Sequence, residues 1–225
     1  MAKLTWDNTG ERFYETGVKN VALYVFDNTS EVKAYKEGVA WNGVTAISES
    51  PSGAEPTALY ADDKKYLNLL SAEEFGASIE AYTYPDEFAE CDGSASLVAG
   101  VTVGQQTRSK FALAYKTTIG NDEVGNSLGY KLHIIYNCLA APSEKSYNTI
   151  NDSPEAITFS WDISTTPETF TVDGKEYSTA CITIDSRKVD KTKLEALETK
   201  LFGGTEPDSK PTLVLPNEIC NTMKK

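Results

Sequence analysis

The segments FALAYK (residues 111–116), YKLHIIYNC (residues 130–138) and ITFSWDI (residues 157–163) decide the fold, because large apolar side chains recur in them at every second position. A period of two predicts strands that each bury one face. All three segments lie within residues 106–165, and polar, turn-rich connections separate them. Strands with one apolar and one polar face are typical of antiparallel sheets, so we expect a mainly β fold.

The faces opposite the apolar side chains carry basic residues in the first two strands. Arg108, Lys110 and Lys116 have one parity in the first strand, and Lys131 and His133 share a face of the second, where Ile135 is the exception. We expect these faces to point to water, a partner or a lumen.

Other segments predict further strands and hairpins. Residues 20–26 (NVALYVF) are apolar at both parities, which predicts a central strand. Asn42-Gly43 and Asp173-Gly174 each separate two short strand-like runs and predict tight two-residue hairpins. Residues 49–56 contain two prolines and a glycine, and a short strand follows them, so we expect a protruding hairpin before Asp62-Asp63.

One helix is well signalled, at about residues 190–202. Asp190 is a suitable N-cap, three leucines keep helical spacing, and Gly203 ends the pattern. Residues 212–215, before Pro216, predict a last short strand. We expect one domain over residues 1–225, with an extended N-terminal arm at residues 1–17 and a C-terminal segment at residues 204–225.

Composition narrows the classes of partner. The net charge of −12 argues against binding to nucleic acid by phosphate neutralisation and against binding to anionic membranes. Neither a signal peptide nor a membrane-spanning apolar run is present, so we expect folding in the cytoplasm. The cysteines are scattered without C-x-x-C spacing, which predicts reduced thiols and no zinc site; they are Cys91, Cys138, Cys181 and Cys220.

The sequence indicates no catalytic chemistry. His133 is the one histidine, and neither a nucleophile elbow nor a glycine-rich phosphate loop occurs. The acidic residues near Asp86 lack the order of a calcium loop. We therefore predict no enzyme and no catalytic, cofactor-binding or metal-binding residue. The twelve tyrosines and three tryptophans leave one alternative, a carbohydrate-binding β-sandwich module of a phage or bacterial surface protein.

Ordered segments along nearly the whole chain resemble the major tail proteins of long-tailed phages that infect Gram-positive bacteria. After an N-terminal arm, they are WNGVTAISESPSGAEPTALYADDKKY (residues 41–66), FAECDG (88–93), RSKFALAYKT (108–117), YKLHIIYNCLAAPSEKSYNTI (130–150) and ITFSWDISTTP (157–167). The resemblance implies an antiparallel β-sandwich or β-barrel of the tail tube type, flanked by one helix. It also implies a structural protein of the virion tail, assembled in the host cytoplasm.

Members of that family form hexameric rings that stack into a tube. The resemblance implies as partners further copies of the chain, a tape-measure protein, and tail terminator and distal tail proteins. It also implies that DNA passes through without specific binding, and an acidic lumen would favour such passage. On this basis we predict lumen or subunit contacts at Arg108, Lys110, Lys116, Lys131 and His133. We predict inter-ring contacts at Trp6, Phe13, Ser50, Pro51, Gly53, Asp62, Asp63 and Lys64.

Overall fold

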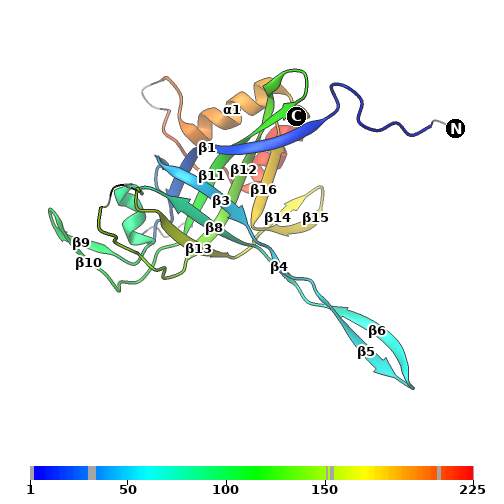
Figure 1. Ribbon diagram of the computed structural model, residues 1–225, viewed down its shortest axis with the longest axis horizontal. Coiled ribbons are helices and arrows are strands. Elements are labelled where there is room, and N and C mark those ends of the chain that lie inside the picture. The colour runs from blue at the N-terminus through cyan, green and yellow to red at the C-terminus, as the bar shows by residue number, and fades with distance from the viewer. Residues whose placement is uncertain (1–2, 30–33, 151, 153–154, 207–208, 225) are drawn as a thin grey trace.

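The computed structural model describes residues 3–29, 34–150, 152, 155–206 and 209–224. Within these residues an eight-stranded antiparallel sheet forms the body of the molecule (Figure 1). Along the sheet the strands follow the order β2 (Val39–Ala40), β1 (Phe13–Val25), β11 (Phe111–Asn121), β12 (Gly125–Ala140), β13 (Phe159–Thr165), β8 (Gly76–Ala81) and β3 (Val44–Glu49), while β16 (Cys181–Asp185) pairs with β12 beside this path. The prediction of a mainly β fold is confirmed.

Strand β12 changes the face that its side chains occupy at Asn137. This residue has a φ of 50°, and the pairing of β12 with β11 shifts register at the same place. Before the shift, Ile134 and Tyr136 lie on one face of the sheet; after it, Cys138 lies on the other. The period of two in residues 130–138 would put Cys138 on the face of Tyr136, and this prediction is wrong because the bulge inverts the parity of the strand.

Two apolar clusters form, one on each face of the sheet. The inner cluster contains Trp161 of β13, Ile79 of β8 and Leu113 of β11, so strands from both halves of the sheet pack into it. The helix-side cluster contains Ile134 of β12 and the buried leucines of the long helix. The sheet curves over the inner cluster, but its described strands do not close into a barrel. Of the two predicted alternatives, a β-sandwich or a β-barrel, the barrel is therefore wrong.

A long ribbon leaves the body where β3 and β8 continue outward. It passes through β4 (Ser52–Gly53) and β7 (Glu73–Glu74) and ends in β5 (Pro56–Ala61) and β6 (Lys64–Leu70), as Figure 1 shows. We call residues 50–75 the arm. At Gly53 the φ of +82° and the Ala72 carbonyl oxygen, 2.3 Å from where a Cβ would stand, both require glycine. The prediction of a protruding hairpin is confirmed, but its turn lies at Asp62-Asp63 and not in residues 49–56, which run along the ribbon.

Shorter elements surround the sheet. The hairpin of β14 (Glu168–Val172) and β15 (Lys175–Thr179) turns at Asp173-Gly174, as predicted. A second hairpin joins β9 (Ala95–Val98) to β10 (Val101–Val103), and a 3₁₀ turn, η1 (Asp86–Glu90), follows Pro85.

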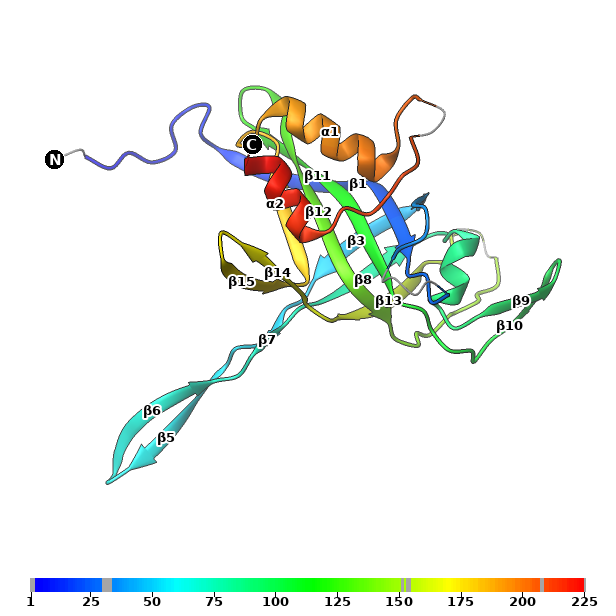
Figure 2. The same cartoon turned by 180° about the vertical axis from the view of Figure 1, so that it is seen from behind.

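Two helices cover the outer face of the sheet (Figure 2). The first, α1 (Lys191–Phe202), has Asp190 as N-cap and matches the prediction. The second, α2 (Pro216–Lys224), is an addition to the single helix that we predicted. Residues 212–215 form no strand; they lead into α2 and bury Leu213 and Val214 in the helix-side cluster. Neither described helix is long and apolar enough to cross a membrane.

Two predictions near the N-terminus are wrong. Asn42-Gly43 makes a turn but no hairpin, because β2 before it pairs with β1 and β3 after it pairs with β8. The extended N-terminal segment also ends earlier than residue 17, since β1 begins at Phe13 and pairs there with Asn121 of β11. In both places a long-range pairing overrides the local signal.

Candidate functional site

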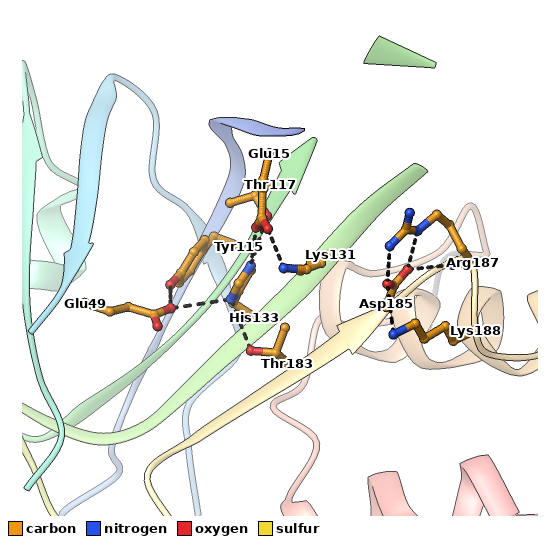
Figure 3. A network of polar contacts seen from close by, with 10 residues as sticks. All are labelled: Glu15, Glu49, Tyr115, Thr117, Lys131, His133, Thr183, Asp185, Arg187 and Lys188. Atoms are coloured by element: carbon orange, nitrogen blue, oxygen red, sulfur yellow. Dashed lines mark hydrogen bonds and ion pairs between the residues drawn. The ribbon is translucent and has the colours of Figure 1, made fainter. Parts of the chain in front are cut away.

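A polar cluster lies on the inner face of the sheet, beside the inner cluster (Figure 3). We call it the His133 network; its members are Glu15, Glu49, Tyr115, Thr117, Lys131, His133 and Thr183. Strand register brings them together, because β11 and β16 flank β12 and place Tyr115 and Thr183 opposite His133. The network therefore joins the strands β1, β3, β11, β12 and β16.

The imidazole of His133 is buried, with 8% of the residue exposed. Its Nε2 lies 3.0 Å from Thr117 Oγ1 and 3.6 Å from Glu15 Oε1. Its Nδ1 lies 3.3 Å from Thr183 Oγ1 and 3.4 Å from Glu49 Oε1. The ring also stacks on Tyr115, with centroids 4.8 Å apart and planes at 3°. Both ring nitrogens thus face oxygen atoms of the same chain.

The two carboxylates of the network have further donors. Glu15 pairs with Lys131 and accepts the hydroxyl of Thr117, while the Tyr115 hydroxyl donates to Glu49 Oε1 at 2.6 Å. Burial raises the pKa of Glu15, but the bonds from Lys131 and Thr117 outweigh it and leave the pKa below its ordinary value. The hydrogen bond with His133, assisted by the one from Tyr115, lowers the pKa of Glu49. Burial and the bond to Glu49 raise the pKa of Tyr115.

A second ion pair stands next to this network, at the end of β16. Arg187 donates to both carboxylate oxygens of Asp185, at 3.0 and 2.7 Å, and its guanidinium lies 5.2 Å from the ring centroid of Phe13. The hydrogen bonds from Arg187 lower the pKa of Asp185 to about 2. Arg187, Phe13, Glu15 and Lys131 border an open hollow of about 200 Å³. This end of the sheet is therefore rich in paired charge.

The geometry suits bracing of strands better than contact with a small molecule. A substrate would reach a ring nitrogen of His133 only by displacing Thr117, Thr183 or a carboxylate of the chain. No group of metal-ligating side chains is found in the described part of the chain. What the network can do chemically is hold five strands together and change its hydrogen bonds when the imidazole gains or loses a proton.

The five predicted lumen or subunit contacts do not share one face. Lys131 and His133 lie together in the network. Lys116 lies on the opposite face beneath α1, where its Nζ is 2.8 Å from Glu198 Oε1 and 4.5 Å from the ring centroid of Tyr130. The sequence pattern gives Arg108, Lys110 and Lys116 the same parity. Only Lys116 lies in β11, however, and Arg108 and Lys110 precede that strand, so the three do not share a face.

Arg108 and Lys110 lie at the far end of the sheet from the network. Arg108 donates to the Ala140 carbonyl at 3.1 Å and lies 3.8 Å from Asp92. Arg108 and the exposed Lys110 both border a hollow of about 440 Å³. Roles in a lumen or a subunit contact stay predictions for all five residues.

The predicted inter-ring residues are all exposed. Trp6 precedes β1, and Phe13 begins it. The others lie on the arm: Ser50, Pro51 and Gly53 near its base, Asp62 and Asp63 at its turn and Lys64 at the start of β6. Contact with another ring stays a prediction for each of them.

The apolar side chains of the arm were not predicted as a site. In β5 and β6 they are largely exposed; they are Leu59, Tyr60, Tyr66, Leu67, Leu69 and Leu70. The hairpin of β9 and β10 likewise exposes Leu97, Val98 and Val101. The signal in the sequence is a strand with apolar residues at both parities, next to the charged turn at Asp62-Asp63. The spacing of Leu67, Leu69 and Leu70 fits either a helix or a strand, so the sequence alone does not identify this surface.

Comparison of the chain with protein-family models and with curated proteins finds no match.

Proposed function

We propose that this protein is a self-assembling structural subunit, the major tail tube protein of a long-tailed phage. In this proposal hexameric rings stack into a tube in the virion tail, and the curved sheet is of the tail tube type. The resemblance of the ordered sequence segments supports the identity of the assembly. The arm supports self-assembly independently of that resemblance.

The arm is the observation that carries the proposal. Tyr60 is 73% exposed, Tyr66 72% and Leu70 70%. Every residue of β6 is exposed, so the body of the same chain covers none of them. A lone two-stranded hairpin is marginally stable in water, and contiguous exposed apolar side chains mark interaction sites. A surface on another protein molecule would bury these side chains and stabilise the arm.

A second copy of the chain is the partner that the shape favours. The arm projects from one end of the body, and the exposed β9–β10 hairpin projects from another (Figures 1 and 2). Contacts between different surfaces of identical copies are heterologous, and they build rings or open filaments. The sheet also ends at β2 and β3 with edges that are unpaired among the described strands, and neighbours can cover such edges.

The charge agrees with a passage for DNA. A net charge of −12 on each copy repels phosphate, so a tube of such subunits would let DNA pass without holding it. The tape-measure, tail terminator and distal tail proteins complete the proposed set of partners.

Sedimentation velocity and negative-stain microscopy of the purified chain test this proposal. We expect wild-type protein to form rings or tubes as its concentration rises. The triple variant Leu67→Ser, Leu69→Ser, Leu70→Ser should stay monomeric, because it removes the three exposed leucines of β6. A matched control is Tyr177→Ser on the exposed β14–β15 hairpin, which should assemble like the wild type. A wild-type chain that is monomeric at every concentration would contradict the proposal.

A further inference from the structure

The His133 network holds the base of the arm. Glu49 is the last residue of β3, directly before the arm, and its partner across the ribbon is Ala77 of β8. Its carboxylate does not bond along the ribbon but reaches the body, where it meets Tyr115 and His133 (Figure 3). The contact of Glu49 with His133 therefore links the direction of the arm to the main sheet.

This contact needs a proton on Nδ1 of His133. A protonated imidazole donates from both nitrogens, to Glu49 at Nδ1 and to Thr117 at Nε2. A neutral imidazole carries one N–H. The shorter distance, 3.0 Å to Thr117 Oγ1, keeps it on Nε2, because the Thr117 hydroxyl proton is committed to Glu15. The lone pair of Nδ1 then faces Glu49 Oε1 across 3.4 Å and repels it.

Thr183 stabilises the neutral state. Its hydroxyl lies 3.3 Å from Nδ1 and can donate to the lone pair there. The released Glu49 keeps its hydrogen bond from Tyr115, so both states leave few polar atoms unsatisfied. Two states with different partners for one nitrogen are what a switch requires.

Charged and titratable groups face the imidazole from each strand that packs against it. They are Glu15 from β1, Glu49 from β3, Tyr115 from β11, Lys131 from β12, Cys181 from β16 and Arg187 beyond β16. Lys131 is paired with Glu15, and Arg187 with Asp185. The carboxylates stay ionised and Tyr115 stays neutral between pH 5 and 8, the range in which histidine changes charge.

We propose that His133 is a pH-sensitive latch for the arm, closed on Glu49 when the imidazole is protonated and open when it is neutral. At the acidic end the charges of Glu15 and Glu49 are balanced by Lys131 and His133. At the alkaline end Glu49 loses its contact with His133 and keeps only the hydrogen bond from Tyr115, so one of the two side-chain contacts at the base of the arm is lost. The latch acts within a single chain; its effect on assembly rests on the proposed function, because the arm is then the contact that it controls.

Nuclear magnetic resonance of the full-length chain tests the latch, at a concentration where it is monomeric. The chain has one histidine, so its imidazole signals need no assignment by mutation. We expect the amide signals of residues 48–53 to shift between pH 5 and 8 with the same midpoint as the imidazole. Amides of the β14–β15 hairpin should not follow it, because that hairpin does not touch the network.

Two carboxamide variants separate the latch from general electrostatics. In Glu49→Gln the charge at the base of the arm is lost, and the shift of residues 48–53 with the imidazole should disappear. In Glu74→Gln an exposed carboxylate of the arm is lost, yet that shift should persist because Glu74 is not part of the His133 network. The proposal is overturned if residues 48–53 do not follow the imidazole in the wild type, or if they still follow it in Glu49→Gln.

Light scattering against pH then measures assembly separately. A pH dependence that Glu49→Gln abolishes supports control of assembly by the latch. A chain that never assembles but whose arm follows the imidazole would overturn the proposed function and leave the latch standing.

Discussion

The body and the arm use similar apolar side chains in opposite ways. In the inner cluster the rings of Phe88 and Trp161 are buried, with centroids 5.1 Å apart, and Trp41 packs beside them. In the arm, Tyr66 and Leu70 are exposed along a ribbon two strands wide. Burial in the body stabilises the fold of one chain, whereas the exposed residues of the arm contribute little until another surface covers them. Stability and association are thus located in different parts of the molecule.

The largest change in stability is expected at Trp161. Trp161→Ala removes a fully buried ring and the hydrogen bond from its Nε1 to Asp92 Oδ1, 3.0 Å long. Such a truncation costs about 3–5 kcal/mol in the free energy of unfolding. Urea unfolding followed by circular dichroism measures it. A loss below about 1 kcal/mol would show that the inner cluster is not the main source of stability.

A smaller change is expected at the N-cap of α1. The Oδ1 of Asp190 accepts the backbone N–H of Lys193 at 3.1 Å, and Asp190→Ala leaves that donor without its partner. We expect a loss of about 1 kcal/mol in the same urea experiment. Lys191→Ala, at an exposed position of the same helical turn, is the control and should have little effect. Equal losses in both variants would argue against the capping bond.

A pH-dependent and still smaller change is expected at Asp185, because solvent screens its ion pair with the partly exposed Arg187. Arg187 lowers the folded-state pKa from 3.8 to about 2, so the carboxylate contributes stability above its ordinary pKa and loses it as pH falls towards 2. Asp185→Asn should therefore be less stable than the wild type at neutral pH, and the two should converge near pH 2. Thermal unfolding at several pH values tests this; a constant difference at all pH values would contradict it.

The smallest change in stability is expected in the arm itself. Tyr66→Ser removes a ring that is 72% exposed, so the free energy of unfolding should change by no more than about 0.5 kcal/mol. The same substitution should weaken self-association, measured by sedimentation velocity. If Tyr66→Ser destabilised the monomer as much as Trp161→Ala, the contrast between arm and body would be wrong.

Local signals predicted the elements whose partners lie nearby in the sequence. The Asp173-Gly174 hairpin and the Asp190 cap depend on a few adjacent residues, and both predictions are confirmed. Asn42-Gly43 has an equally strong hairpin signal, but Trp41 before it donates its backbone N–H to Val21 of β1. Its two flanking strands are therefore held by different neighbours, which no local pattern encodes.

Pro216 is a sequence signal for the start of helix α2, but the prediction took it as the end of a strand. Proline is favoured at the first position of a helix and also follows strands, and the acidic Glu218 in the first turn supports the helix. The interpretation of Pro216 as the end of a strand missed this.

The sequence predicts part of the His133 network, namely the shared face of Lys131 and His133. Lys131 and His133 share a parity in one strand, so their placement on one face follows from the sequence. Glu15 and Glu49 come from β1 and β3, and their approach depends on sheet register and curvature. Neither of these quantities can be read from a single strand.

The burial of both faces of β12 determines how the molecule unfolds. Because β12 supplies Ile135 and Cys138 to the inner cluster and Ile134 and Tyr136 to the helix-side cluster, neither cluster can melt without disturbing the strand that the other requires. Heat should therefore disrupt both in one all-or-none transition, with equal calorimetric and van't Hoff enthalpies. Strands that bury side chains on both faces of the sheet make one cooperative unit out of two cores.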